Sequence, residues 1–558
     1  MAGMISNTIV FLVFIGGITC GGILKSHDTL KYKRNLEVLK EVFEGPLGGK
    51  IVTIYLDSSI SNEIVQNIFS FNALEKTGYQ IVSMETDPVK WAQLQPKAFI
   101  KGNFMVHIAI FVNDPSSFFK RLPLTWNPEI LLLFSLAEIT ETSVLNNSAY
   151  KGIKSLALIQ KLTRKYLTTA SEVAVLTNYP FLPNNKTRLV GVWNSQKFRT
   201  LEELFPERFN SFEEQLFPLS TSFDDFPYSY NYTVNGTITH RGLGLDMVDV
   251  FSKKFNFTYT LTAQAPDENW GKYINGSWNG LLGEIDHGEK LFTVNFFTMN
   301  HLRMQHFEAS VPYWREGFGI AILTPPPLPK WQNAYLPFKP SLWLLCLFTL
   351  IMVIIIMAIQ DKIQPVRFFG GVSDIWHYML RSTFNQGVDN LPSADWQRLF
   401  LTFWFMYSFI LANVYSSNLI AVLTVPVFPK RLATLQEFAD SSYRLGMQDY
   451  GEFVEGAIKS SNDEIYRKIG KRFDLFKTNW QLMASLNTSK YAYTDSYAYA
   501  RYMASIGHKN VSETYFLKEQ LYPGFVCWYF RLNIPWTYKF NEGITRVIEA
   551  GLINFWMK

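Results

Sequence analysis

The stretch from Leu399 to Thr424 constrains the fold of this chain more than any other. No charged residue stands between Arg398 and Lys430, a run longer than the roughly 20 residues that a helix needs to cross a bilayer. The last third of the stretch is polar, with amides and hydroxyls at Asn413, Tyr415, Ser416, Ser417 and Asn418. Such groups are costly against lipid but tolerated where they face a partner helix or a water-filled path. The pattern predicts either a helix that lines such a path or a polar seam between packed helices.

A second uncharged run, Ser341 to Gln360, fits one further span. Between the two runs lies Ser373 to Asp389, whose apolar part is too short to cross a bilayer and is followed directly by Arg381. A short segment of this kind predicts a re-entrant loop, which is allowed at membrane depth only where protein or water surrounds it. A span, a re-entrant loop and a polar span together predict an ion pore.

Length and composition fit a membrane protein with large soluble parts, because the chain has 558 residues and is 48% apolar. The net charge of +5 is too mild for a dedicated nucleic-acid binder. Met1 to Gly22 resembles a signal peptide, with a buried first strand as the alternative. The sequence holds no nucleophile elbow, zinc motif or phosphate loop, so we expect neither an enzyme nor a cofactor. His301 and His306 lack a third ligand for a metal.

N-x-Ser/Thr glycosylation acceptors flank the membrane block on both sides. They are Asn146, Asn185, Asn231, Asn235, Asn256, Asn275, Asn487 and Asn510. None lies between Lys330 and Lys430, so we expect both flanks to be extracellular. Cys20 falls in the signal segment and Cys346 in a span, which leaves Cys527 without a partner for an intrachain disulfide.

The soluble parts predict two α/β units. In the first unit, continuous apolar strands separated by helical stretches predict a small domain with a largely parallel sheet. These strands are Lys50–Asp57, Tyr79–Glu85, Val106–Asn113, Glu129–Leu136 and Glu172–Tyr179. The second unit starts with a strand at Arg188–Ser195, and its pattern resumes after the membrane block with a helix predicted at Phe540–Met557. This order predicts a periplasmic-binding-protein-like bilobe that is interrupted by the membrane segments.

Four motifs resemble the ionotropic glutamate receptor superfamily. VYSSNLIAVLT (Val414–Thr424) is similar to the family's gating helix SYTANLAAFLT, and FNQGVD (Phe384–Asp389) to its pore-loop tip. WNGLLGEI (Trp278–Ile285) is similar to WNGMVGEL, and FNEGITRVIEAGLINFW (Phe540–Trp556) to the closing LNEQGLLDKLKNKWW. The resemblance covers Arg188–Lys558. The short N-terminal part and the divergence resemble the arthropod ionotropic receptors of chemosensation.

The resemblance implies an α/β fold plus membrane helices: a bilobed clamshell interrupted by an inverted potassium-channel-like pore module, behind a small α/β N-terminal domain. The expected parts are a signal peptide (1–22), the N-terminal domain (23–187), a first-lobe segment (188–330), the membrane block (331–429) and a second-lobe segment (430–558). Within the membrane block, spans at 341–360 and 399–425 surround a pore loop at 373–389. The family has a further span after the second lobe, and the printed sequence ends where that span would begin.

The implied function is a ligand-gated, non-selective cation channel subunit in the plasma membrane of a sensory neuron, at its dendrite. Its expected partners are a small-molecule ligand (an acid, an amine or another odorant), permeant cations, the lipid bilayer and homologous co-receptor subunits in a heterotetramer. Nucleic acid is not an expected partner. The alternative is a non-conducting binding, decoy or modulatory subunit that acts only in heteromers.

The resemblance also implies the ligand-binding residues. Thr298 and Arg303 stand at the spacing of the family's threonine and arginine, whose planar guanidinium holds a ligand carboxylate. Asp495 aligns with the acidic contact for a ligand amine and is followed by Ser496, and Trp270 lies where the family caps the ligand with a tyrosine. For Arg303 and Asp495, a purely structural role stays open.

Two departures from the family pattern argue against glutamate as the ligand. Phe296 replaces the proline seven residues before the arginine, and Glu452 and Phe453 replace the serine-threonine pair after Gly451. An added carboxylate and a lost hydroxyl should disfavour a ligand's distal carboxylate.

In the pore, Asn385 occupies the family position that tunes divalent permeability, beside Gln386 and Gly387. Asp389 is expected either to concentrate cations at the inner mouth or to be a solvated loop carboxylate. The gate is expected at Tyr415, Ser416, Ser417, Asn418 and Ala421.

Overall fold

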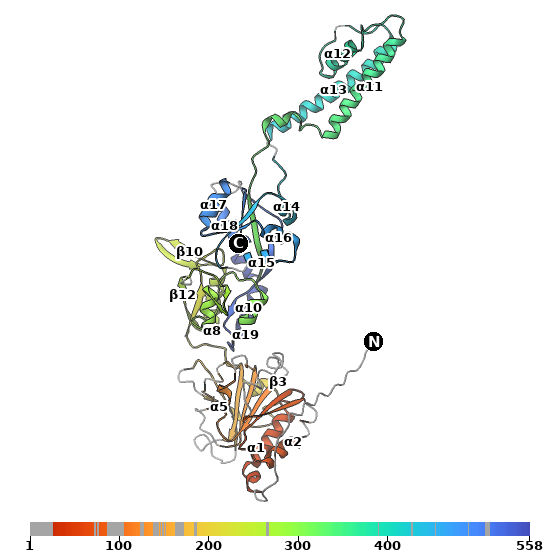
Figure 1. The fold of residues 1–558 in the computed structure, drawn as a ribbon. Coiled ribbons are helices and arrows are strands. Elements are labelled where there is room, and N and C mark those ends of the chain that lie inside the picture. Colours follow the sequence, from red (N-terminus) through yellow and green to blue (C-terminus); the bar gives the residue numbers. More distant parts are fainter. Residues whose placement is uncertain are drawn as a thin grey trace, which may run out of the picture.

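The computed structural model describes residues 26–557 except 72–73, 75–77, 86–104, 123–125, 127, 138–143, 146, 148–149, 151, 162–171, 183–186, 264–266, 389, 426–427, 452–453, 489 and 508–513. Three bodies follow one another along the molecule: an N-terminal domain, a bilobed domain and a block of membrane helices (Figure 1). The bilobed domain lies between the other two.

The N-terminal domain is a seven-stranded sheet with the order β2-β1-β3-β4-β5-β6-β7. Strands β2, β1, β3, β4 and β5 pair in parallel, whereas β6 pairs antiparallel with both of its neighbours, β5 and β7. The elements are α1 (Ser26–Glu44), β1 (Ile51–Leu56), α2 (Asn62–Phe69), β2 (Tyr79–Ser83), β3 (Met105–Phe111), α5 (Ser116–Lys120), β4 (Ile130–Ser135), β5 (Ser155–Lys161), β6 (Val173–Asn178), β7 (Thr187–Val192) and α7 (Leu201–Leu204).

Both faces of this sheet are covered because side chains alternate along each strand. Val52 and Ile54 of β1 pack with α1 and α2, while Tyr55 packs against Phe118 and Phe119 of α5. The largely parallel sheet agrees with the sequence prediction. Strand β5 was not predicted.

The boundary between the N-terminal and bilobed domains differs from the predicted one. Thr187–Val192 pairs with β6 as the edge of the N-terminal sheet, although the sequence predicted this stretch as the first strand of the bilobe. Phe198 and Leu204 also belong to the N-terminal core, whereas Phe209 packs in the bilobe. The boundary therefore lies between Phe205 and Phe209. The short polar segment at 194–197 lies within the N-terminal domain and does not end it.

Lobe 1 combines the segment before the membrane block with the end of the chain. Its first elements are β8 (Gln215–Thr221), β9 (Asp224–Asp225), β10 (Ser229–Val234), β11 (Thr237–Arg241), α8 (Leu243–Phe255), β12 (Phe257–Ala263), β13 (Tyr273–Ile274), β14 (Ser277–Trp278), α9 (Gly280–Asp286), α10 (His301–His306) and β15 (Glu308–Ala309). The returning elements are β22 (Tyr529–Phe530), α19 (Thr537–Glu549) and α20 (Leu552–Trp556).

The end of the chain packs on lobe 1, although the sequence assigned all of 430–558 to the second lobe. The ring of Phe540 in α19 lies 5.7 Å from that of Phe251 in α8 and 5.2 Å from that of Phe292. These apolar contacts bury one face of α19 and hold the end of the chain on lobe 1. The helix predicted over Phe540–Met557 is broken at Gly551, whose φ of 72° lies in the left-handed region that favours glycine.

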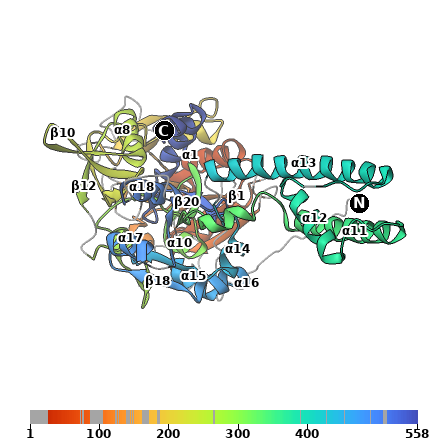
Figure 2. The ribbon, with the colours of Figure 1, turned by 90° about the horizontal axis from the view of Figure 1, so that it is seen from above.

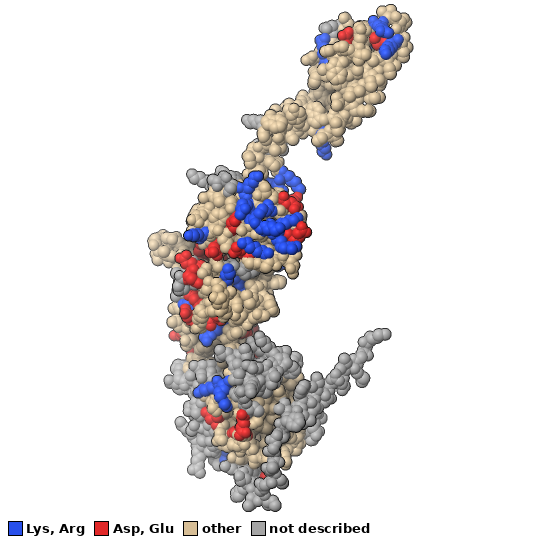
Figure 3. Space-filling model, viewed as in Figure 1, with Lys and Arg blue, Asp and Glu red and all other residues tan. Residues whose placement is uncertain are grey.

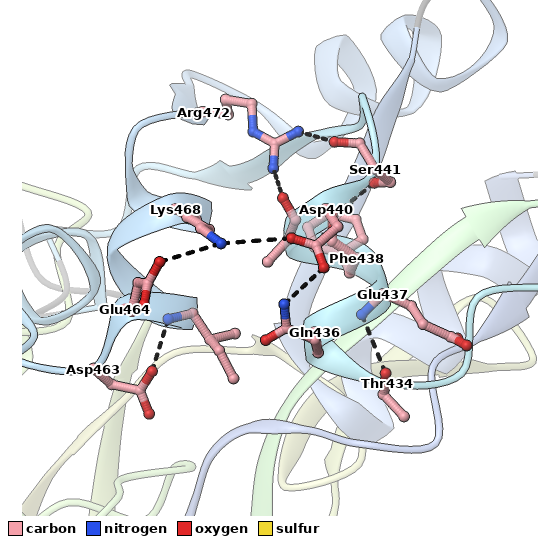
Figure 4. A network of polar contacts seen from close by, with 12 residues as sticks. Thr434, Gln436, Glu437, Phe438, Asp440, Ser441, Asp463, Glu464, Lys468 and Arg472 are labelled. Atoms are coloured by element: carbon pink, nitrogen blue, oxygen red, sulfur yellow. Dashed lines mark hydrogen bonds and ion pairs between the residues drawn. The ribbon is translucent and has the colours of Figure 1, made fainter.

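Lobe 2 is built on a sheet with the order β18-β17-β19-β16-β20, with β21 also paired to β16. Its elements are β16 (Trp314–Leu323), α14 (Leu435–Asp440), β17 (Arg444–Gln448), α15 (Val454–Ser460), α16 (Glu464–Gly470), β18 (Phe473–Phe476), α17 (Asn479–Thr488), β19 (Tyr491–Ser496), α18 (Tyr497–Gly507), β20 (Thr514–Phe516) and β21 (Leu521–Val526). Arg472 ties the end of α14 to α16 by donating to the carbonyl oxygens of Ala439 and Ser441 (Figure 4).

The membrane block comprises η3 (Lys330–Ala334), α11 (Pro340–Ile363), α12 (Val372–Thr383) and α13 (Asp395–Thr424). Helices α11 and α13 are long and apolar enough to cross a membrane, and most of their side chains are exposed. They project away from the lobes (Figures 1 and 2). Charged residues gather at the far end of the block and leave its length uncharged (Figure 3). The core helix of a soluble domain would be buried, so this exposure favours contact with lipid.

Candidate functional site

A small cavity lies between the two lobes. Its volume is about 20 Å³, enough for about one water molecule. Lobe 1 contributes Asp224, Asp225, Trp270, Phe296 and Thr298, lobe 2 contributes Met447, Tyr450, Asp495, Ser496 and Tyr499, and β16 contributes Phe318. Four of the five predicted ligand residues therefore meet around one cavity, although they come from distant parts of the sequence.

Asp225 is the buried acid of lobe 1. It ends the short strand β9, and only 3% of its surface is exposed. Its Oδ2 accepts hydrogen bonds from Asn295 Nδ2 (2.9 Å) and from the backbone N–H of Phe296 (2.8 Å). Burial is the main reason why the pKa of Asp225 is raised to about 8, and the nearby carboxylates of Asp495 and Glu316 raise it further.

Asp495 is the buried acid of lobe 2, at the end of β19 where that strand pairs with β16. Its side chain accepts from the backbone N–H of Ser496 (2.7 Å) and from the hydroxyls of Tyr450 (3.3 Å) and Tyr493 (3.2 Å). It is 8% exposed, and burial raises its pKa to about 7 against the pull of these three donors.

Direct hydrogen bonds join the two lobes beside the cavity. The hydroxyl of Tyr499 donates to Asp224 Oδ1 (2.8 Å), and the backbone N–H of Trp270 donates to the carbonyl oxygen of Tyr450 (2.8 Å). Asn479 Nδ2 donates to both tyrosine hydroxyls, at 2.7 Å to Tyr450 and 3.2 Å to Tyr499. The cleft is therefore closed by the protein's own side chains and backbone.

Arg303 is the one predicted ligand residue that does not line the cavity. It lies in α10, is 1% exposed, and its Nη1 donates to the carbonyl oxygen of Thr298 (3.3 Å). Its guanidinium also lies 5.2 Å from the centre of the Phe297 ring. Its guanidinium thus holds the backbone of Thr298, which itself lines the cavity.

Sequence reasoning missed Asp224, Asp225, Tyr450 and Tyr499 as cavity residues. The two aspartates form an adjacent acidic pair between phenylalanines directly after a buried strand, and this pair in an apolar setting was a usable signal. The tyrosines follow β17 and β19, and no motif marks them. A Cβ at Gly451 would lie 2.8 Å from Asn269 Oδ1 of lobe 1. Glu452, Phe453 and Asp389 lie outside the described residues.

The predicted pore-loop tip follows directly after α12. Asn385 has a positive φ of 54° and its N–H donates to the carbonyl oxygen of Ser382 (3.1 Å). Arg381 Nη2 donates to the carbonyl oxygen of Gly387 (2.7 Å) and so holds the tip as a compact turn. Asn385, Gln386 and Gly387 are exposed in the single chain. They are therefore open to contact with other subunits or with ions.

The predicted gate residues of α13 divide between two faces. Tyr415 packs on Phe338 and Trp343 and donates to the carbonyl oxygen of Ala334 (3.1 Å), on the same face as buried Ser408. Asn418 donates to the carbonyl oxygen of Pro337 (3.4 Å). Ser417 follows Ser408 by two and a half helical turns and so lies on the opposite face, with Ala421 next to it. Ser416, Ser417 and Ala421 are exposed.

Four predicted glycosylation sites fall on described side chains, and all four are exposed on lobe 1: Asn231, Asn235, Asn256 and Asn275. Asn146, Asn185 and Asn510 lie outside the described residues, as does the side chain of Asn487.

Two known families match consecutive parts of the chain after the N-terminal domain. Residues 217–327 match the ligated ion channel L-glutamate- and glycine-binding site family, a range that covers most of lobe 1 and the whole of β16. Residues 339–515 match the ligand-gated ion channel family, from the start of α11 into β20. Together the two matches cover both the cleft and the membrane block.

Individual relatives are distant. The kainate-type ionotropic glutamate receptor glr-3 of Caenorhabditis elegans is 27% identical over 271 residues, 45% of this chain and 31% of the relative. A glutamate receptor of Lymnaea stagnalis is 22% identical over 282 residues, 48% of this chain and 29% of the relative. The delta-1 ionotropic glutamate receptor of mouse is 25% identical over 231 residues, 39% of this chain and 22% of the relative. The chain therefore spans less than a third of the length of these relatives.

Proposed function

The chain belongs to the ionotropic glutamate receptor family and is not an enzyme, and from this premise we propose that it is a subunit of a ligand-gated cation channel. A small molecule in the cleft stabilises the closed arrangement of the lobes, and this closure pulls on the pore helices.

The observation that carries the proposal is the connection between the cleft and the membrane block. Strand β16 lies beside β19, which ends in Asp495, and the chain runs from β16 into α11. Helix α13 returns directly to α14. Both pore helices are thus attached to lobe 2, as the two thin connecting segments in Figure 1 show. A movement of lobe 2 against lobe 1 is transmitted to both helices at once.

The geometry of α12 supports cations as the permeant species. Its C-terminal end leads to the exposed tip at Asn385, and backbone carbonyls at a helix C-terminus carry partial negative charge. Rings of carbonyl and amide oxygens from several subunits replace the hydration shell of a cation. Asn385, Gln386 and Gly387 are proposed to form the narrow part of such a ring.

The finer proposal is a divergent chemosensory receptor that works in a heterotetramer with homologous co-receptor subunits at the plasma membrane. It is supported by the low identity to the named glutamate receptors and by Phe296, which fills the cleft where the family pattern has proline. Thr298, Asp495, Ser496 and Trp270 are proposed to contact the ligand, and Arg303 to position Thr298.

The proposal is tested by voltage clamp on cells that express the full chain, alone and with a homologous co-receptor, during application of small acids and amines. We expect cation currents that require a ligand and that the co-receptor strengthens. Saturable ligand binding without current in either setting would instead favour a non-conducting binding subunit. Absence of both binding and current, with normal surface expression, would overturn the proposal.

A further inference from the structure

We propose that the cleft selects a small primary amine in its ammonium form and excludes ligands that carry a carboxylate. This inference rests on the proposed function, because it assigns a ligand class to the same cleft. A primary amine without a carboxylate differs in this way from glutamate and other amino acids, which carry at least one carboxylate.

The described lining of the cavity is acidic and holds no basic side chain. Among the described residues that line it are three carboxyl groups, those of Asp224, Asp225 and Asp495, and no lysine, arginine or histidine. Arg303, the residue at the family's carboxylate anchor, is turned to the carbonyl oxygen of Thr298 and lies outside the lining. A ligand carboxylate would therefore enter a desolvated site that offers it only other carboxyl groups and no cation to offset the cost of its burial, which disfavours its binding.

The acids retain capacity to accept hydrogen bonds from a cation. The bonds that described residues donate to the side chain of Asp225 both end on Oδ2, which leaves Oδ1 as an acceptor. Asp495 accepts three donors, whereas a carboxylate offers about four lone-pair sites. A primary ammonium group has three N–H donors, and such groups are charged at neutral pH. The volume of the cavity also suits a ligand group of the size of a water molecule, such as an ammonium group.

Aromatic rings supply the rest of the recognition. Trp270 and Tyr450 lie edge to face with ring centres 6.1 Å apart, and Phe296 and Phe318 lie 6.2 Å apart at 90°. All four rings line the cavity. Indole, phenol and phenyl faces attract ammonium groups electrostatically, and the attraction is strongest in a desolvated site. The same rings provide an apolar surface for a short hydrocarbon tail.

The test is calorimetric titration of the full chain in lipid nanodiscs with probes of equal length: n-butylamine, n-butanol and butyrate. We expect saturable binding of butylamine and binding of the alcohol and the acid that is at least about tenfold weaker. Asp495→Asn should weaken butylamine binding about tenfold or more, and Trp270→Leu by a smaller factor. Asp440→Asn, the same charge change on the exposed surface of lobe 2, is the matched control and should leave binding unchanged.

Butyrate binding equal to or tighter than butylamine binding would overturn the inference, as would absence of binding by every probe. The wild-type series decides the question even if Asp495→Asn fails to fold. Because the readout is binding, amine binding without current would contradict the proposed channel function and leave this inference intact. Currents evoked by butyrate without any amine binding would contradict this inference and leave the proposed channel function intact.

Discussion

At the scale of single residues, buried carboxyl groups define the cleft, and no lysine, arginine or histidine is among the described residues that line it. Asp225 has Asp495, Glu316 and the hydroxyls of Tyr228 and Tyr313 in its surroundings. Glu316 accepts hydrogen bonds from Tyr228 and from the backbone N–H of Ala498, so it links lobe 1 to α18 of lobe 2. The protonation of these acids is therefore coupled to the closure of the lobes.

The first prediction concerns stability against pH. In the folded chain the pKa is about 8 for Asp225 and about 7 for Asp495, whereas both are near 4 once unfolded. Between these values the unfolded state binds fewer protons than the folded state, so the free energy of unfolding falls as pH rises from about 4 to about 8 and then levels off. Chemical unfolding, followed by tryptophan fluorescence, measures this slope.

Asp225→Asn keeps an oxygen for the two donors and removes the titration, so it should flatten this slope. Asp440→Asn, whose side chain is exposed beside Lys468 (Figure 4), should not. An identical slope in Asp225→Asn and the wild type would show that this carboxyl does not hold its proton in the folded chain.

The second prediction separates two roles for Arg303. If it holds the Thr298 backbone, Arg303→Ala should destabilise the bilobed domain by about 2–5 kcal/mol, as expected for truncating a fully buried side chain. Arg315→Ala, which removes an arginine with an exposed side chain beside Phe525, is the control and should change stability little. Unchanged thermal stability together with a lost ligand response would instead assign Arg303 to direct ligand contact.

The sequence motifs identified four residues that line the cleft in the structure: Thr298, Trp270, Asp495 and Ser496. They did not identify Tyr450 and Tyr499, because the position of these two tyrosines depends on how β17 and β19 meet lobe 1, and no local pattern encodes that closure. For Arg303 the motif predicted a contact with the ligand, and this stays a prediction; in the structure its guanidinium donates to the carbonyl oxygen of Thr298.

At the scale of elements, the two long apolar helices lie where the charge-free runs of the sequence predicted them, because such runs are read directly from the sequence. The expected spans at 341–360 and 399–425 correspond to α11 and α13, and the re-entrant segment to α12 with its exposed tip. In contrast, β7 and α19 were assigned to the wrong lobe or domain. Strand and helix propensity fixes that an element forms, whereas its pairing depends on contacts with residues far away in the sequence.

The third prediction concerns the two faces of α13. Ser417 and Ala421 lie opposite the face that packs within the subunit, so we expect them at the crossing of neighbouring gating helices. Ser417→Trp and Ala421→Thr should disfavour that crossing by about 1–3 kcal/mol and raise ligand-free opening about 5- to 150-fold. Voltage clamp measures the standing current. Leu423→Trp, on another exposed face, is the control, and wild-type closed-state current in surface-expressed Ser417→Trp would refute the assignment.

The fourth prediction concerns the pore-loop tip. Asn385→Arg adds a ring of positive charge where each subunit exposes this residue, and it should suppress divalent permeation. Reversal potentials in calcium-based and sodium-based solutions give the permeability ratio. Asn390→Arg, in the same loop but beyond the tip, should change the ratio less. An unaltered calcium-to-sodium ratio in conducting Asn385→Arg channels would mean that the tip does not line the narrow pore.

At the scale of the whole molecule, the ligand cleft lies between the N-terminal domain and the membrane block (Figure 1). Lobe 1 joins the N-terminal domain, and lobe 2 carries both pore helices. The proposed closure of the cleft would therefore move both pore helices relative to the N-terminal domain. This division was expected from the family resemblance. The direct hydrogen bonds that hold the lobes closed were not expected. They join residues that are far apart in the sequence, and no local pattern marks them.

The central claim is that closure of the lobes opens the pore, and a disulfide across the cleft tests it without any ligand. A Cβ at Gly451 would lie 3.3 Å from the Cβ of Asn269 in the other lobe, close to the spacing of a disulfide. We predict that the double variant Asn269→Cys/Gly451→Cys conducts continuously under oxidising conditions and loses this current in dithiothreitol, whereas dithiothreitol leaves the current of each single variant unchanged. Cross-linked chains that reach the cell surface and stay silent would contradict the account.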